Sequence, residues 1–161
     1  MLQLRPATPA DVPAILDLIR ELADFEQLLH EVSADAATLG KHLFGEPARA
    51  EVLMAEVAGE TAGFALFFHN FSTFLGKPGL YLEDLYVRPP FRGRGYGRFI
   101  MRHLARLAVE RGCGRLEWWV LDWNEAAIRF YRSLGAVAMQ DWTVQRVSGE
   151  ALFRLAQSRS E

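Results

Sequence analysis

Apolar residues in the first third of the chain recur at helical spacing, in two successive runs. Thr8 and Pro9 are typical of a helix start, and the first helix is expected to reach about Gln27. Ser33 is the expected cap of a second, shorter helix that ends near Phe44. The apolar stripe of the first helix consists of Val12, Ile15, Leu16, Ile19 and Leu22.

Short apolar runs between turn residues indicate strands in the rest of the chain. The run at 116–121 does not alternate, which is typical of a strand buried on both faces. Two further helices are expected, one at about Gly95–Arg111 and one from Asn124 to just before Gly135. The expected strands are Leu2–Arg5, Ala50–Val57, Ala62–Phe71, Tyr81–Val87 and Leu116–Leu121, with one or two closing strands in Val137–Trp142 and Thr143–Leu155.

The order of these elements, β-α-α-β-β-β-α-β-α-β-β, predicts an α/β fold. We expect a twisted, mixed but mostly antiparallel sheet of six to seven strands, with helices on both faces. A length of 161 residues fits a single domain over 1–161.

Composition and charge narrow the possible partners. A net charge of -2 without a Lys/Arg block argues against a nucleic-acid partner. The sequence has no run of 18 apolar residues, so no membrane span is expected. Cys113 is the single cysteine, so no disulfide can form within the chain, and we expect a cytoplasmic protein. The four histidines do not stand at ligand spacing from acids, so no metal is expected.

A Gly-rich loop follows the Tyr81–Val87 strand and opens the third helix. Alternating glycines allow main-chain amides to converge on one anion, and the helix directs its positive end to the same place. The loop therefore predicts a phosphate cradle for a nucleotide-like cofactor, with a basic turn of no further function as the alternative. It lacks the G-K-[ST] of a P-loop and departs from the Rossmann G-x-G-x-x-G. The loop contains Gly93, Gly95 and Gly97 with Arg92, Arg94 and Arg98.

Two adjacent acids, Glu83 and Asp84, interrupt the strand that enters this loop. Partial burial would raise a carboxyl pKa toward the range of a general base, whereas solvated or salt-bridged acids would have no such role. Strand neighbours point to opposite faces, so the two acids are expected to meet different surfaces. Tyr131 is either a core tyrosine or a proton donor, and Asn124 is either a helix cap or a ligand contact.

The pattern Arg92-x-x-Gly95-x-Gly97, after a strand that ends L-Y-V-R-P, resembles the acetyl-CoA signature of the GNAT N-acetyltransferase superfamily. W-N-E-A-A-I-R-F-Y-R-S-L-G at 123–135 resembles its second cofactor segment. R-P-A-T-P-A-D, L-Y-L-E-D-L-Y-V and W-N-E also resemble the spermidine/spermine (diamine) N-acetyltransferase branch, over most of the chain.

The resemblance implies a role for each matching position. Glu83 would draw a proton from the amine, and Tyr131 would serve the departing thiolate. The cofactor residues would be Leu85, Tyr86 and Val87 for the pantetheine arm, Arg92, Gly93, Arg94, Gly95, Tyr96, Gly97 and Arg98 for the pyrophosphate, and Asn124, Glu125, Ala126 and Ala127 further along. The substrate residues would be Phe25, Glu26, Glu83, Glu117, Trp118, Trp119 and Asp141.

The resemblance therefore implies an acetyl-CoA-dependent N-acetyltransferase that acts on a small cationic di- or polyamine, in a homodimer. The amine would attack the thioester directly, and a main-chain N–H at a bulge near Leu85 would hold the developing oxyanion. Two alternatives stay open. One is an acetyltransferase for lysine-like amino acids such as thialysine, for which the sequence offers no assigned carboxylate-binding cation. The other is a CoA-binding sensor without turnover.

Overall fold

A mixed β-sheet organises the larger part of the chain in the computed structural model, which describes residues 1–159. The described residues form five strands in the order β1-β2-β3-β4-β5. The neighbours from β1 to β4 pair antiparallel, and β5 pairs parallel to β4. The strands are β1 (Leu2–Pro6), β2 (Glu51–Val57), β3 (Glu60–Ser72), β4 (Lys77–Val87) and β5 (Leu116–Trp118).

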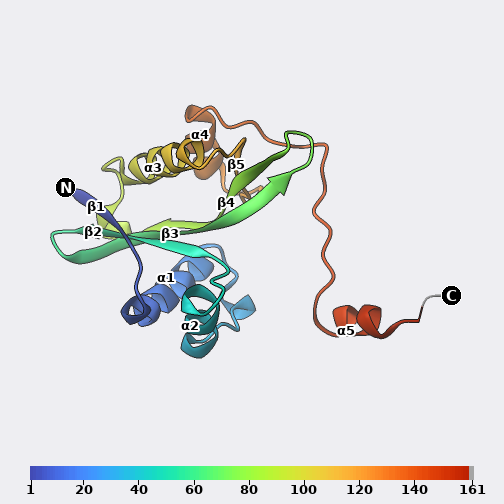
Figure 1. Cartoon of the computed structure of the whole chain (residues 1–161). Coiled ribbons are helices and arrows are strands. Elements are labelled where there is room, and N and C mark those ends of the chain that lie inside the picture. The colour runs from blue at the N-terminus through green and yellow to red at the C-terminus, as the bar shows by residue number, and fades with distance from the viewer. Residues whose placement is uncertain (160–161) are drawn as a thin grey trace. The chain divides into compact units, whose positions relative to one another are not determined.

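Helices cover both faces of this sheet, as Figure 1 shows. The face on one side carries α1 (Val12–Phe25) and α2 (Ala36–Phe44), and the other face carries α3 (Tyr96–Glu110). The predicted mixed sheet between two helical layers is therefore confirmed, with fewer strands among residues 1–159 than expected. The remaining elements are the 3-10 turns η1 (Pro9–Asp11), η2 (Leu29–Glu31) and η3 (Pro89–Phe91), and the helices α4 (Glu125–Ser133) and α5 (Gly149–Gln157).

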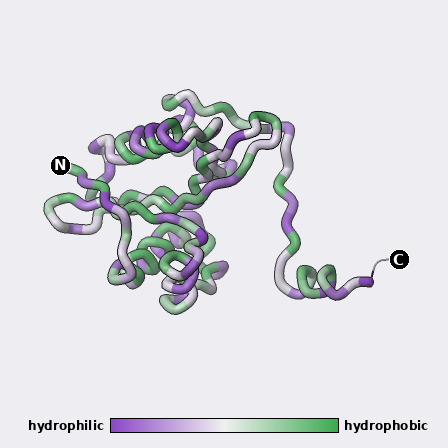
Figure 2. The backbone as a smooth tube through the Cα atoms, viewed as in Figure 1, coloured by the Kyte–Doolittle hydropathy of each residue, from purple (hydrophilic) through white to green (hydrophobic). Residues whose placement is uncertain are grey.

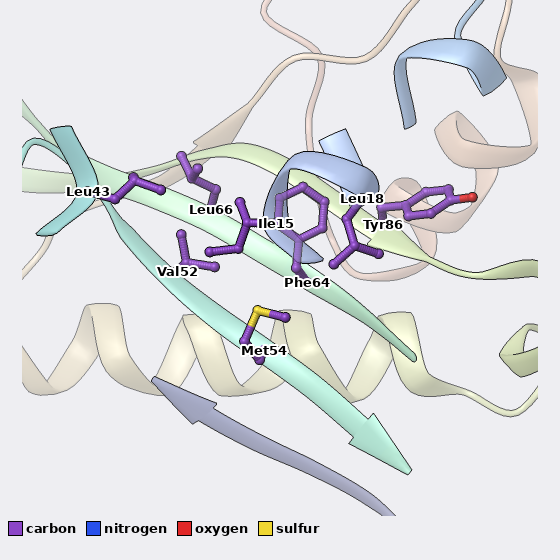
Figure 3. Packing of buried hydrophobic residues seen from close by; sticks show 8 residues of the cluster. All are labelled: Ile15, Leu18, Leu43, Val52, Met54, Phe64, Leu66 and Tyr86. Atoms are coloured by element: carbon purple, nitrogen blue, oxygen red, sulfur yellow. The ribbon is translucent and has the colours of Figure 1, made fainter. Parts of the chain in front are cut away.

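The main hydrophobic cluster lies between α1, α2 and the sheet, and Figure 3 shows its side chains. Alternate strand residues face this cluster and the intervening ones face α3, because successive side chains of a strand point to opposite faces. Figure 2 shows hydrophobic positions concentrated on β2 and β3, and polar positions interleaved with hydrophobic ones along α3. The cluster consists of Ile15, Leu18, Leu43, Val52, Met54, Phe64, Leu66 and Tyr86. The buried residues of α3 are Ile100, Met101, Leu104 and Ala108.

The cap of the second helix is Asp35, and the expected cap Ser33 lies two residues before it. The carboxylate Oδ1 of Asp35 accepts a hydrogen bond of 2.8 Å from the N–H of Thr38. Both residues are good N-caps, and the one that can reach the third helical N–H determines where the helix begins. The predicted end of the helix at Phe44 is confirmed.

Contacts divide the chain into two compact units, Met1–Glu125 and a second that begins at Ala126, and each is described by itself. The second unit contains most of α4 and all of α5. Residues 137–148 form no strand, and the end of the predicted Thr143–Leu155 strand belongs to α5, so the expected closing strands are wrong. A short apolar run forms a strand only if a partner strand pairs with it, and among the described residues none pairs with this segment.

Of the helices in residues 1–159, none combines the length and the apolar character that crossing a membrane requires.

Candidate active site

A β-bulge in β4 shapes the candidate site. Asp84 lies opposite Leu66 of β3, whereas Leu82 lies opposite Phe67, so Glu83 is the extra residue between two paired positions. The bulge was expected near Leu85, and it lies two residues earlier. A bulge interrupts the regular alternation of a strand and turns its side chains.

The bulge brings both adjacent acids to the same face of the sheet. Asp84 shares the face of Leu66, which belongs to the α1 cluster. Counting from Leu82, which lies opposite the buried Phe67 on the α3 face, the alternation also places Glu83 on the α1 face. The expectation that the two acids meet different surfaces is therefore wrong, because it assumed a regular strand.

Burial and like charge raise the pKa of Asp84 to about 7, through burial first and then through the charges of Glu83 and Glu26. Burial also raises the pKa of Glu26, which follows the last residue of α1. Asp84 is half-buried, whereas Glu83 is exposed. A carboxyl that titrates near neutrality can exist in both proton states at the working pH of an enzyme, which suits a general base.

Aromatic rings line the same face beside the acids. Tyr81 packs against Phe68, with ring centroids 5.1 Å apart, and against Trp119 at 6.1 Å. Burial raises the pKa of Tyr81 to about 12, with further contributions from Glu83, Glu117 and Asp84. Aliphatic ammonium groups pair with carboxylates and stack on aromatic faces, so this face suits a small cation.

The strand register separates the predicted substrate residues of β5. Glu117 lies opposite Tyr81 and shares the acidic face. Trp118 lies opposite Leu82, on the face of α3. Phe25 is the last residue of α1, and its ring lies 6.4 Å from that of Trp123. The structure therefore gathers Glu26, Glu83 and Glu117 with the aromatic residues, and directs Trp118 to the other side.

The Gly-rich loop has the main-chain geometry that an anion site requires. Gly93 and Gly95 have positive φ angles of 76° and 78°. Among the described residues, the main-chain N–H groups from Gly93 to Gly97 have no hydrogen-bond partner. These groups precede and open the 15-residue α3, whose dipole favours an anion at its N-terminus. The loop thus fits a diphosphate, and its residues are those expected for the pyrophosphate of acetyl-CoA.

Among residues 1–159, no strand pairs with the edge of β4 next to this loop. β5 ends at Trp118, opposite Leu82, while β4 continues to Val87. The main-chain N–H of Arg88 donates to the oxygen of Ala62 across the sheet. Because main-chain groups of successive strand residues alternate in direction, the N–H and C=O of Leu85 point away from β3. The main-chain N–H and C=O groups of Leu85 at this edge match the amides of a pantetheine arm. The same alternation turns the main-chain groups of Tyr86 toward β3.

Arg92 contacts the protein through both its main chain and its side chain. Its main-chain N–H donates to Pro89 at 3.2 Å, and its Nε donates to the oxygen of Val87 at 2.7 Å. The guanidinium carbon lies 5.2 Å from the ring centroid of Phe25 and 5.4 Å from that of Tyr86. The side chain therefore lies on the acidic face of β4, near the end of α1.

The remaining predicted residues lie at or after the boundary between the units. Asn124 directly precedes α4 and donates its N–H to Leu121 at 2.9 Å. Glu125 begins α4, and Ala126 and Ala127 follow in its first turn. Tyr131 and Asp141 belong to the second unit, where the ring of Tyr131 lies 5.4 Å from that of Phe130. Their roles stay predictions.

Sequence reasoning chose Glu83 as the base and missed the special surroundings of Asp84. A signal was present, because Leu82 and Leu85 stand three residues apart where a regular strand would place same-face residues two apart. Such a slip in the apolar pattern is typical of a bulge. The contact of Arg92 with Phe25 joins residues distant in sequence, and no local pattern predicts it.

Several known proteins with similar sequences are named as acetyltransferases of amines. A thialysine N-epsilon-acetyltransferase of Bos taurus is 38% identical, over 95% of this chain and 96% of its own length. The L-ornithine N5-acetyltransferase NATA1 of Arabidopsis thaliana is 33% identical, over 93% of this chain and 86% of its own. The human spermidine/spermine N(1)-acetyltransferase-like protein 1 is 34% identical over 96% of this chain, which spans 24% of that longer protein.

Among solved structures, an integron cassette protein from V. cholerae has a TM-score of 0.81 and 26% identity, covering 98% of both chains. The model of the acetyltransferase (GNAT) family matches residues 15–136. The family uses acetyl-CoA as acetyl donor, and the loop and the open edge of β4 are the matching features here. The chain belongs to the GNAT acetyltransferase family, and it is an acetyl-CoA-dependent N-acetyltransferase of amines.

Proposed function

We propose that the acetyl acceptor is the primary amine of a small, flexible aliphatic cation, either a di- or polyamine or a basic amino acid. The observation that carries this proposal is the shared face of Glu26, Glu83, Asp84 and Glu117 beside the aromatic rings. The charges of Glu83 and Glu26 raise the pKa of Asp84, and a bound cation would relieve this repulsion, whereas an anionic acceptor would add to it.

The first chemical task of these acids is to remove a proton. An alkyl ammonium has a pKa of about 10.4 in the case of lysine, so almost all of it is protonated at neutral pH. Asp84 accepts this proton, because its pKa of about 7 lets it start as a carboxylate and end as an acid. Glu83, the base expected from the sequence, draws the ammonium to the bulge and relays the proton through water.

The second task is the transfer itself. Acetyl-CoA supplies an activated thioester carbonyl, and the amine nitrogen attacks its carbon while the carbon–sulfur bond breaks. Main-chain N–H groups beside Leu85 donate to the carbonyl oxygen as charge develops there. Tyr131 donates a proton to the departing sulfur. A thiol has a pKa of about 8.5, so this proton assists departure and is not essential to it.

The two acceptor classes have separate support. The acids on β4, β5 and the end of α1 suit the several charges of a polyamine. The names of two relatives, which act on ornithine and thialysine, favour an amino acid with a terminal amine. The expected homodimer stays a separate prediction, which a mass measurement in solution tests.

The deciding experiment follows the release of CoA thiol with a panel of amines. The panel contains putrescine, spermidine, L-ornithine, L-lysine and thialysine, each with saturating acetyl-CoA. We expect release that depends on the amine and a singly acetylated product at a terminal nitrogen. If none of the amines produces release above the hydrolysis background while CoA still binds, the chain is a CoA-binding sensor and the proposal is wrong.

A further inference from the structure

A cavity of about 450 Å³ lies beside the C-terminal half of α3, within the first unit. Its lining residues belong neither to the Gly-rich loop nor to the acidic face of β4 and β5. An α-helix rises about 1.5 Å per residue, so Leu107 in the cavity wall lies about 16 Å along α3 from Tyr96, where the helix begins. The cavity is therefore separate from the candidate active site.

Three parts of the fold enclose this cavity. Its floor is the α3 face of the sheet, with Pro6 opposite Leu53 and Glu51 opposite Phe67. One wall is a stripe of α3, whose members stand four residues apart and so share one side of the helix. The other wall is the end of α2 and the loop that follows it. The stripe consists of His103, Leu107 and Arg111, and the opposite wall includes Leu43, Phe44 and Ala48.

Size and lining suit a small molecule. Ligand pockets have volumes of roughly 300–1,000 Å³ and are mostly apolar, with a few polar groups that orient the ligand. Most of the residues around this cavity are aliphatic or aromatic. The cavity is thus large enough for a compact ring system, whose affinity would come mainly from burial of its apolar surface.

The two charged side chains of the lining neutralise each other. The terminal nitrogens of Arg111 donate to the two carboxylate oxygens of Glu51, at 2.6 and 2.8 Å. These hydrogen bonds lower the pKa of the Glu51 carboxyl, so the pair stays ionised. The guanidinium carbon also lies 5.9 Å from the ring centroid of Phe67. A charged ligand would lose its hydration here without finding an unpaired counter-charge, so the lining favours a neutral one.

His103 supplies a polar group that the fold itself does not use. The side chain is half-buried in the cavity wall, and among residues 1–159 its imidazole has no hydrogen-bond partner. A neutral imidazole donates through one nitrogen and accepts at the other. A hydroxyl group matches either nitrogen, because it can both donate and accept.

We propose that this cavity is a second ligand site, which binds a neutral, mainly apolar molecule through a hydroxyl group hydrogen-bonded to His103. A ring alcohol of the phenol type has this chemistry. The inference goes beyond the proposed function, because the cavity lies apart from the reacting groups and does not depend on which amine is acetylated.

The test measures binding of three compounds with one ring system by equilibrium dialysis: 1-naphthol, naphthalene and 1-naphthoate. We expect 1-naphthol to saturate at one molecule per chain. It should bind about threefold tighter or more than naphthalene, because it adds one hydrogen bond. It should bind about tenfold tighter or more than 1-naphthoate, because the carboxylate must be desolvated.

Two tryptophan variants locate the bound molecule. Leu107→Trp fills the cavity and should abolish binding of 1-naphthol. Val109→Trp is the matched control, because it adds the same ring to the same helix at an exposed position and should leave binding unchanged. Thermal unfolding of each variant shows whether it is folded.

A third variant tests the hydroxyl contact and decides alone if Leu107→Trp does not fold. His103→Leu should reduce the affinity for 1-naphthol to that for naphthalene, while the affinity for naphthalene stays nearly the same. A merely structural role of His103 would change the affinities for both compounds equally.

Several results would overturn the proposal. They are the absence of saturable 1-naphthol binding, a preference for 1-naphthol that persists in His103→Leu, and 1-naphthol binding that a folded Leu107→Trp retains. In the last case, displacement by CoA would place the molecule in the cofactor site instead. Each of these results leaves the proposed function standing, because that function is judged by amine-dependent release of CoA.

Discussion

Glu83 and Asp84 are sequence neighbours on β4, and the bulge between Leu82 and Asp84 turns both acids to the face covered by α1. A regular strand would have separated them. Because Asp84 shares this face with Glu83 and Glu26, the charges of these two residues add to the effect of burial, and together they raise the pKa of Asp84 to about 7. The bulge thus creates a group that can exchange a proton near neutral pH beside the expected path of the thioester.

The first prediction concerns the base. With Asp84 as proton acceptor, kcat/KM for the amine should fall as the pH drops below about 7, because the carboxylate becomes protonated. Asp84→Asn should lower kcat/KM by about 10²- to 10⁴-fold and remove this acidic limb. The measurement is a pH–rate profile at saturating acetyl-CoA.

Glu83→Gln is the matched comparison for this base. It removes the neighbouring charge, so it should lower the pKa of Asp84 and move the acidic limb to lower pH, with a smaller loss of rate. If Glu83→Gln abolishes the limb and Asp84→Asn keeps it, Glu83 is the base, as the sequence suggested.

A second prediction links the same residue to stability. The pKa of Asp84 is higher in the folded chain, about 7, than the ordinary 3.8. The folded state therefore binds the proton of Asp84 more tightly than the unfolded state does. The stability that this bound proton contributes is present at low pH and is lost as the pH rises through about 4 to 7. Asp84→Asn should raise the free energy of unfolding at pH 8 by on the order of 2 kcal/mol, and by less at pH 5.

Urea unfolding at the two pH values tests this claim separately from activity. A variant that is inactive yet more stable at pH 8 would agree with a carboxylate that serves the reaction and costs the fold stability when it is ionised. Loss of stability at pH 8 would mean that the carboxylate has favourable partners in the fold.

A third prediction tests the phosphate loop. Gly95 has a φ of 78°, where an L-residue costs about 1–2 kcal/mol, although an added Cβ would meet no atom within 4 Å. Gly95→Ala should therefore weaken binding of acetyl-CoA by distorting the main-chain N–H groups, as titration calorimetry would measure.

Gly40→Ala is the matched control, because Gly40 lies within α2 and an added Cβ there also meets open space. Replacing a mid-helix glycine should stabilise the chain by about 0.5–1 kcal/mol without changing acetyl-CoA binding. If both variants bind acetyl-CoA with equal affinity, the loop is not part of the cofactor site.

A fourth prediction concerns Tyr131. Tyr131→Phe should lower kcat, by about 10-fold or more, while the Kd for acetyl-CoA stays nearly the same, because only a proton donor is removed. A stopped-flow measurement of thiol release beside a binding titration separates the two quantities. Loss of binding or of folding would make Tyr131 structural.

The features that sequence predicted well are those with a local signature. Thr8 and Pro9 marked the 3-10 turn η1, which leads directly into the first helix at Val12. The glycines from Gly93 to Gly97 marked a loop whose main-chain N–H groups have no partner among the described residues. Apolar runs and turn residues also located β2 and β3 to within two residues at each end. These patterns reflect short-range physics, in which each residue constrains its own neighbourhood.

The features that sequence missed depend on partners far along the chain. Apolar residues after Val137 predicted strands, yet no described strand pairs with them. The surroundings of Asp84 depend on the register with Leu66 and on Glu26, and the position of Arg92 depends on Phe25. Such contacts become visible only when the fold brings distant segments together.

The most direct test of the whole account is a crystal structure with CoA and L-ornithine bound. We expect phosphate oxygens within about 2.7–3.2 Å of main-chain nitrogens between Gly93 and Gly97, and the terminal nitrogen of ornithine at hydrogen-bond distance from Asp84 or from a water that it binds. A diphosphate bound elsewhere, or an amine on the α3 face of the sheet away from the bulge, would contradict the account.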